Sequence, residues 1–133
     1  QDFPLEQYYR DARIHPIHEG TTGIQGLDLL GRKIMMQDGR AYGLYLEEIQ
    51  RTIEKASGIG PLSSYTRKLE KACELLQSVT THMKSLATSA GPEVFLADAT
   101  VYLEFFSIIA VAWQWLKQME TDKSLLMASL KGK

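Results

Sequence analysis

The sequence has almost no charge imbalance and almost no cysteine. It contains 15 Lys and Arg against 16 Asp and Glu, a net charge of −1, so no overall field favours nucleic acid or an anionic membrane surface as a partner. The single cysteine, Cys73, excludes an internal disulfide, and its place in an apolar row predicts a small core residue. The chain also opens without a recognisable signal peptide. Together these features favour a cytoplasmic protein.

Strand patterns and long apolar runs are missing as well. No useful length of sequence alternates apolar and polar residues at period two, so we expect no sheet. The longest uncharged run, residues 105–116, falls short of the roughly 20 residues that span a bilayer. Glu104 and Lys117 bracket it, so no membrane span is expected. We also find no zinc-ligand spacing, no phosphate-binding glycine loop and no Ser/His/Asp arrangement.

Helical periodicity dominates the sequence that remains. Apolar residues at three- and four-residue steps predict helices over residues 3–13, 24–37, 40–56 and 62–90, a fifth from residue 92, and a weak last helix over 121–130. Asp38-Gly39, the segment 57–61 and Gly91-Pro92 predict the breaks between them. Short connections favour an all-α fold, an antiparallel helical bundle of about five helices that is truncated at both ends.

Two of these helices have distinctive apolar patterns. The helix over 62–90 has one unbroken apolar row, which predicts a seam against neighbouring helices: Leu62, Tyr65, Leu69, Ala72, Leu76, Val79, Met83, Leu86 and Ala90. The fifth helix is apolar over most of its circumference. Such a helix is buried, inserted in a membrane or covered by a partner. We expect burial in the middle of the bundle, with one side free to meet another region.

The segment 9–25 has the pattern of a functional site. Pro16 prevents the first helix from continuing, so the chain leaves helix before Glu19. Gly20 permits close approach of a bulky ligand, and Thr21 or Thr22 can cap the next helix, whose positive end suits an anion.

Two other interpretations of this segment remain open from local chemistry. It can be an ordinary connection between helices with a solvated glutamate. It can also be a metal site made of His15, His18 and Glu19, but Pro16 disfavours a helical histidine face and a fourth ligand is lacking, so we expect no metal.

A resemblance to a known protein family favours the interpretation of segment 9–25 as a functional site. Several short motifs, in one order and spacing, resemble the end of the catalytic region of an acyl-CoA dehydrogenase: Asp2-Phe3-Pro4-Leu5-Glu6, Arg10-Asp11-Ala12, Ile17-His18-Glu19-Gly20-Thr21 and Ile24-Gln25. The sequence from about Met35 onward is similar to the extra C-terminal helical region of a long-chain branch of that family. We therefore expect a C-terminal fragment with two parts, the end of the catalytic helical domain at 1–37 and an additional, incomplete helical region at 38–133.

The resemblance implies a flavin-dependent oxidoreductase of fatty acid β-oxidation that converts an acyl-CoA thioester to the 2-enoyl-CoA. Glu19 matches the base that removes the proton next to the thioester carbonyl, and the hydride passes to FAD. Gly20 matches a position against the acyl-CoA substrate, whereas Thr21, Thr22 and Gly23 match the segment that contacts FAD. An electron acceptor such as electron-transfer flavoprotein, and a homo-oligomeric full-length enzyme, are implied as partners.

The resemblance also has departures and gaps. His18 stands where relatives often have tyrosine, and Arg10 is expected to pair with Asp11 to fix the first helix. Most flavin contacts of the family lie in domains upstream of Gln1, so we expect the fragment alone neither to retain FAD nor to turn over substrate. The alternative is a non-catalytic helical module in which the fourth and fifth helices serve docking or oligomerisation.

Overall fold

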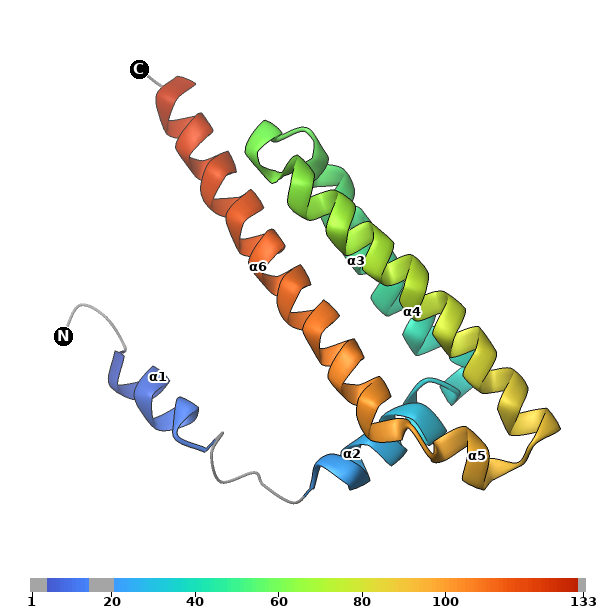
Figure 1. The fold of residues 1–133 in the computed structure, drawn as a ribbon. Coiled ribbons are helices and arrows are strands. Elements are labelled where there is room, and N and C mark those ends of the chain that lie inside the picture. The colour runs from blue at the N-terminus through green and yellow to red at the C-terminus, as the bar shows by residue number, and fades with distance from the viewer. Residues whose placement is uncertain (1–4, 15–20, 132–133) are drawn as a thin grey trace.

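The computed structural model describes residues 5–14 and 21–131, and within these ranges the chain is helical throughout, without a strand (Figure 1). The all-α prediction is therefore confirmed. The elements are α1 (Leu5–Ala12), α2 (Thr22–Asp28), the π-helix η2 (Leu29–Lys33), the 3-10 helix η3 (Met36–Gly39), α3 (Arg40–Ser57), the 3-10 helix η4 (Gly60–Leu62), α4 (Ser63–Ser89), α5 (Pro92–Leu96) and α6 (Ala99–Lys131).

Three long helices form the body of the bundle. α3, α4 and α6 contact one another pairwise, and α4 runs antiparallel to both of the others (Figure 1). α2 and η2 pack at one end of this bundle, against the beginning of α6. Short connections of the kind expected from the sequence join α3 to α4 and α4 to α5, because glycine and proline stop each helix at its predicted end.

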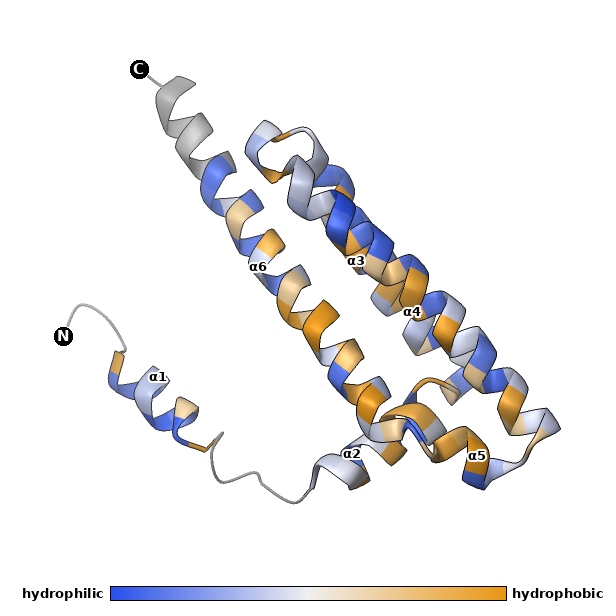
Figure 2. Cartoon of the chain, viewed as in Figure 1, coloured by the Kyte–Doolittle hydropathy of each residue, from blue (hydrophilic) through white to orange (hydrophobic). Residues whose placement is uncertain are grey.

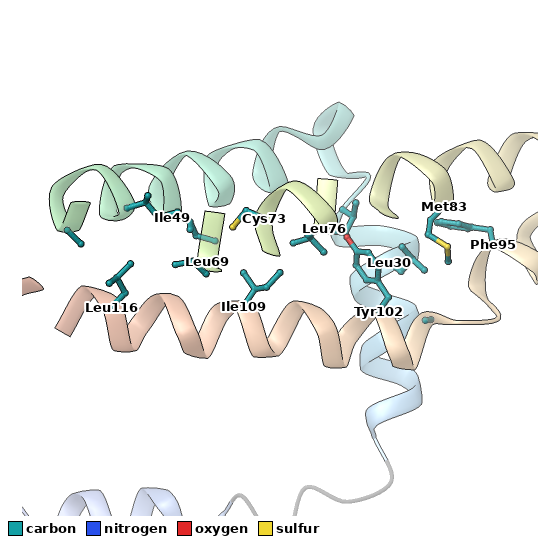
Figure 3. Close-up of a cluster of buried hydrophobic side chains, with 14 of the residues drawn as sticks. Leu30, Ile49, Leu69, Cys73, Leu76, Met83, Phe95, Tyr102, Ile109 and Leu116 are labelled. Carbon is teal, nitrogen blue, oxygen red and sulfur yellow. The ribbon is translucent and has the colours of Figure 1, made fainter. Parts of the chain in front are cut away.

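The core is a continuous row of apolar side chains between these helices (Figure 3). The largest of its fully buried side chains are Leu30, Ile49, Leu76, Ile109 and Leu116. They come from η2, α3, α4 and α6, so each of these elements anchors the others. Full burial of such a side chain stabilises the fold by about 1.5–3 kcal/mol.

The chain between α2 and α3 differs from the expected continuous helix over 24–37. The α-helix ends at Asp28 and widens into the π-helix, where the Ile34 N–H donates to the Leu29 carbonyl at 2.9 Å. Gln37 and Asp38 then have positive φ angles of 50° and 56°. Left-handed backbone at two successive non-glycine residues reverses the chain direction, so the predicted break at Asp38-Gly39 is confirmed but begins earlier.

The buried face of α4 is rotated from the predicted seam. Leu69, Leu76 and Met83 are buried as expected, and Cys73 is a core residue. Tyr65, by contrast, is 54% exposed, and the buried face includes residues that the apolar row left out: Thr66, Cys73 and Thr80. Threonine is tolerated there because its hydroxyl bonds to a backbone carbonyl of the preceding turn, as Thr66 does to Ser63 at 3.0 Å.

The predicted fifth helix is two helices, and the predicted separate last helix does not exist. α5 ends at Leu96, and α6 then runs unbroken for 33 residues, through the stretch 121–130. Burial of α6 is confined to one face. Leu116 is 2% exposed, whereas Ile108 is 61% and Trp115 64% exposed, on the free side that the prediction allowed. The apolar residues of α6 (Figure 2) thus include an exposed stripe that α2, α3 and α4 leave uncovered.

The length and hydropathy of α6 are those of a candidate membrane-spanning helix. Ala99–Lys123 has the length and the mean hydropathy, 1.4, of a candidate membrane span, the one such helix among the residues searched. The core helix of a soluble protein passes the same test, so this helix alone is weak evidence for a span.

Candidate functional site

The structure describes only part of the predicted site. Glu19 and Gly20 lie outside the described residues, as do His15 and His18. Thr21, the residue before α2, is described together with the beginning of that helix, and it is exposed. The three predicted FAD-contacting residues are therefore consecutive and face solvent: Thr21, Thr22 and Gly23.

The start of α2 lacks the predicted threonine cap. The Thr21 side chain bonds no backbone N–H of the helix and instead accepts a hydrogen bond from Gln25 Nε2 at 3.0 Å. The backbone of Gln25 closes the first turn by donating to the Thr21 carbonyl at 2.8 Å. The first N–H groups of a helix have no partner within it, so this end offers donors to whatever lies beside it. A Cβ added at Gly23 would meet nothing within 4 Å, which leaves room there for a flat group.

One turn later, α2 touches the first turn of α6. Gly26 is buried, and a Cβ at this position would lie 2.7 Å from the carbonyl oxygen of Ala99. The larger apolar residues on either side of it, Ile24 and Leu27, are by contrast 70% and 46% exposed. Sequence reasoning missed Gly26; its signal was a glycine inside a helical pattern, which costs roughly 0.5–1 kcal/mol relative to alanine and often has a packing reason.

The ion pairs of α1 also differ from the prediction. Arg10 pairs with Glu6, and Asp11 accepts a hydrogen bond from Gln7 Nε2 at 2.9 Å, so the expected Arg10–Asp11 pair is wrong. Residues four apart face each other on a helix, whereas adjacent residues do not. α1 buries no residue against the rest of the described chain.

A cluster of hydroxyl and aromatic groups lies inside the bundle. The Thr80 hydroxyl lies 2.7 Å from the Tyr102 hydroxyl, 3.1 Å from that of Tyr42, and donates to the Leu76 carbonyl at 2.7 Å. Since that hydroxyl has one hydrogen, Tyr102 is the donor in its own bond to Thr80. Burial raises the pKa of Tyr102 to about 12, so this phenol is neutral at physiological pH.

The neighbouring aromatic group is less satisfied. Tyr45 stacks on Phe106, with ring centroids 4.6 Å apart, and meets the edge of Trp113 at 5.7 Å. Its buried hydroxyl has no hydrogen-bond partner among the described residues, and burial raises its pKa. Trp113 donates to the Thr52 hydroxyl at 2.8 Å. All of these groups join α3 to α6, so they serve the packing of the bundle.

The groove between α4 and α6 holds two apolar cavities of about 420 and 430 Å³. Lys68 and Asp98 are the charged residues in their walls, and neither cavity brings together an acid, a base and a nucleophile. Within the residues searched, no three His, Cys, Asp or Glu side chains are placed to hold a metal ion. The described part of the chain therefore brings no catalytic set of side chains together, and Glu19, the predicted base, lies outside the described residues.

Comparison with known proteins decides the family. A protein family described as "Acetyl-CoA dehydrogenase C-terminal like" matches residues 45–132, which is most of the three-helix bundle. The chain belongs to the acyl-CoA dehydrogenases. Specifically, it belongs to the C-terminal helical region of this oxidoreductase family. No solved structure matches it.

Two curated acyl-CoA dehydrogenases are similar to this chain. A broad-specificity linear acyl-CoA dehydrogenase of Mycobacterium tuberculosis is 35% identical over 94 residues, which cover 71% of this chain and 15% of that protein. A 3-methylmercaptopropionyl-CoA dehydrogenase of Ruegeria pomeroyi is 36% identical over 112 residues, which cover 83% of this chain and 19% of that protein. The acyl-CoA dehydrogenase chain thus spans less than a fifth of the length of these relatives.

Proposed function

We propose that this chain is the C-terminal part of a flavin-dependent acyl-CoA dehydrogenase that converts an acyl-CoA thioester to its 2-enoyl-CoA. The family membership of residues 45–132 supports the enzyme class. The observation that carries the reaction is the Glu19-Gly20-Thr21 motif directly before α2, upstream of the matched region 45–132. The substrate class follows from the relatives, both of which are named as dehydrogenases of acyl-CoA thioesters.

Glu19 is the base in this proposal. Its carboxylate removes a proton from the carbon next to the thioester carbonyl, and the bond to the next carbon becomes a double bond as the hydride leaves. That proton is weakly acidic, so the carboxylate needs a desolvated position and a pKa raised above that of a free glutamate. Gly20, without a side chain, lets the acyl-CoA approach the backbone.

FAD, when bound, accepts the hydride. Three residues at the start of α2 fit such a group: Thr21, Thr22 and Gly23. They are exposed, and they combine two hydroxyls with N–H groups that have no partner within the helix. Most of the flavin site lies outside this chain in the proposal, so the 133-residue chain alone neither retains FAD nor turns over substrate. The full-length enzyme in this proposal is cytoplasmic and homo-oligomeric. Its electron acceptor is electron-transfer flavoprotein or a similar protein.

The test uses the full-length protein. Candidate acyl-CoAs are added without oxygen, and bleaching of the flavin absorbance is followed for the wild type and Glu19→Gln. We expect the variant to bleach about 10²–10⁴ times more slowly, the usual contribution of a general base. Glu6→Gln is the matched control, since Glu6 is an exposed carboxylate on α1 paired with Arg10. Equal bleaching of wild type and Glu19→Gln would show that the base lies elsewhere.

The alternative function is a helical interaction module without catalysis. The exposed apolar stripe of α6, which includes Ile108 and Trp115, favours it. The same experiment separates the two functions, because a full-length wild type that holds no flavin supports the module.

A further inference from the structure

We infer that the first turn of α6 positions the flavin-contacting segment, and that Gly26 is the positioning residue. In this inference, which rests on the proposed function, the C-terminal helical region is a structural part of the flavin site. It packs against the buried side of α2 and holds this helix in place, while the residues at the start of α2 contact FAD.

The contact between α2 and α6 is as close as two backbones allow. A Cβ on Gly26 would lie 2.7 Å from the carbonyl oxygen, 2.9 Å from the carbonyl carbon of Ala99 and 3.1 Å from the nitrogen of Thr100. These are backbone atoms of a helix, so they cannot rotate aside as the end of a side chain can. Ala99 itself is buried. Any side chain at position 26 therefore has to push α2 away from α6.

The rest of this segment is fixed from two sides. Leu30 and Ile34, four and eight residues beyond Gly26, are 1% and 2% exposed, and Figure 3 shows Leu30 beside Tyr102 of α6. On another side, a Cβ at Gly31 would lie 3.3 Å from Leu96 of α5. α2 and η2 thus form one body held by α5 and α6. A displacement at one contact moves the whole segment.

The flavin-contacting residues lie within one turn of this contact. Thr22 precedes Gly26 by four residues, which is about 6 Å along a helix. Because Thr22 and Gly26 belong to the same short helix, a shift at Gly26 is carried directly to the start of α2. A misplacement of roughly 1 Å at a site can cost about 10²-fold in rate.

The glycine at position 26 is therefore expected to matter for binding more than for folding. Alanine is the better helix former by about 0.8–1 kcal/mol, so a glycine in α2 weakens the helix unless the close contact needs it. Away from α2, the long helices α3, α4 and α6 share buried residues of their own, such as Ile49, Leu76 and Leu116. A substitution at Gly26 therefore disturbs the end of the core to which Leu30 and Ile34 belong and leaves these contacts between the long helices in place.

Three glycine-to-alanine variants of the full-length enzyme test the inference. In Gly26→Ala the new methyl group meets backbone, in Gly31→Ala it meets the end of a leucine side chain, and in Gly43→Ala it meets nothing within 4 Å. We measure the FAD dissociation constant, kcat with saturating FAD, and helix content by circular dichroism. Gly26→Ala should weaken FAD binding by about tenfold or more and lower kcat, with helix content retained. Gly31→Ala should have a smaller effect, and Gly43→Ala none.

The outcomes separate this inference from the proposed function. If wild type and Gly43→Ala bind FAD and Gly26→Ala does so equally well with the same kcat, the positioning role is refuted while the proposed function stands. A lower thermal midpoint alone, with unchanged FAD affinity, also refutes it, because that is what a purely structural glycine would give. If wild type binds no FAD, the proposed function itself has failed. Should Gly26→Ala not fold, a weakened FAD affinity in folded Gly31→Ala supports the inference and an unchanged one refutes it.

Discussion

Replacing Thr80 with valine should destabilise the bundle by about 2 kcal/mol, although the side chain keeps its shape. Thr80 is 2% exposed, and its hydroxyl is the centre of the hydrogen bonds that reach α3 and α6 from α4. In Thr80→Val the Tyr102 hydroxyl loses its hydrogen-bond partner at 2.7 Å, on a residue that is only 3% exposed to water.

The magnitude follows from the unequal burial of the two phenols. A buried hydroxyl left without a partner costs about 1–3 kcal/mol, and this applies in full to Tyr102. Tyr42 is half-buried, so water can replace its longer bond of 3.1 Å, and its share is smaller. Removing the other partner instead, in Tyr102→Phe, should cost only about 1 kcal/mol, because the Thr80 hydroxyl keeps its bond to the Leu76 carbonyl.

A double-mutant cycle in the 133-residue chain measures this. The free energy of unfolding is obtained from urea titrations followed by far-ultraviolet circular dichroism, for wild type, both single variants and the double variant. When both partners become apolar, no fully buried hydroxyl of this cluster has lost its partner, and the loss at the half-buried Tyr42 is the same as in Thr80→Val. The double variant should therefore be more stable than the sum of the single losses predicts, by about 1 kcal/mol. Additivity of the two losses within about 0.5 kcal/mol would refute the reasoning.

Two further predictions concern the same core. Leu76→Ala should lower the free energy of unfolding by about 2–5 kcal/mol, since Leu76 is fully buried. Its neighbour Leu75 is 56% exposed and should tolerate alanine within about 0.5 kcal/mol. Similar losses for the two variants in urea titrations would contradict the assigned buried face of α4. The raised pKa of Tyr102 makes the stability of the fold depend on pH. The pKa in the folded protein is about 12, above the ordinary 10.0. The contribution of Tyr102 to the free energy of unfolding is therefore complete below about pH 10 and is lost as the pH rises towards 12. Urea titrations between pH 10 and 12 should show this loss of stability in the wild type and a smaller loss in Tyr102→Phe. A stability that rises with pH in this range would contradict the raised pKa of Tyr102.

The sequence predicts α3 and α4 well because their signals are local. α3 was expected over 40–56 and runs from Arg40 to Ser57, and α4 was expected over 62–90 and runs from Ser63 to Ser89. In both cases an apolar period and a glycine or proline at the end decide the bounds. The widening of α2 into η2 has no such signal, because it depends on how α5 and α6 hold the segment.

Burial by distant elements accounts for most of the remaining differences. Thr80 was left out of the predicted seam because its partners, Tyr42 and Tyr102, come from other helices. The residues of the exposed stripe of α6 could not be predicted, because periodicity counts apolar residues and not the helices available to cover them. For the candidate site, the motif at Glu19 predicts a chemistry, which stays a prediction, whereas the close contact of Gly26 could not be predicted without knowing that α6 begins there.

The contact between Gly26 and Ala99 also determines when the flavin-contacting segment can form. The two residues are far apart in the sequence, with α3, α4 and α5 between them. Closing such a long loop costs chain entropy that must be met before the contact gains anything, and long-range contacts form slowly. During synthesis, α2 leaves the ribosome long before the helix that holds it. In the proposed enzyme, the residues at the start of α2 therefore take their final position only after the chain has been made as far as the first turn of α6, so flavin uptake has to follow the synthesis of α3, α4 and α5.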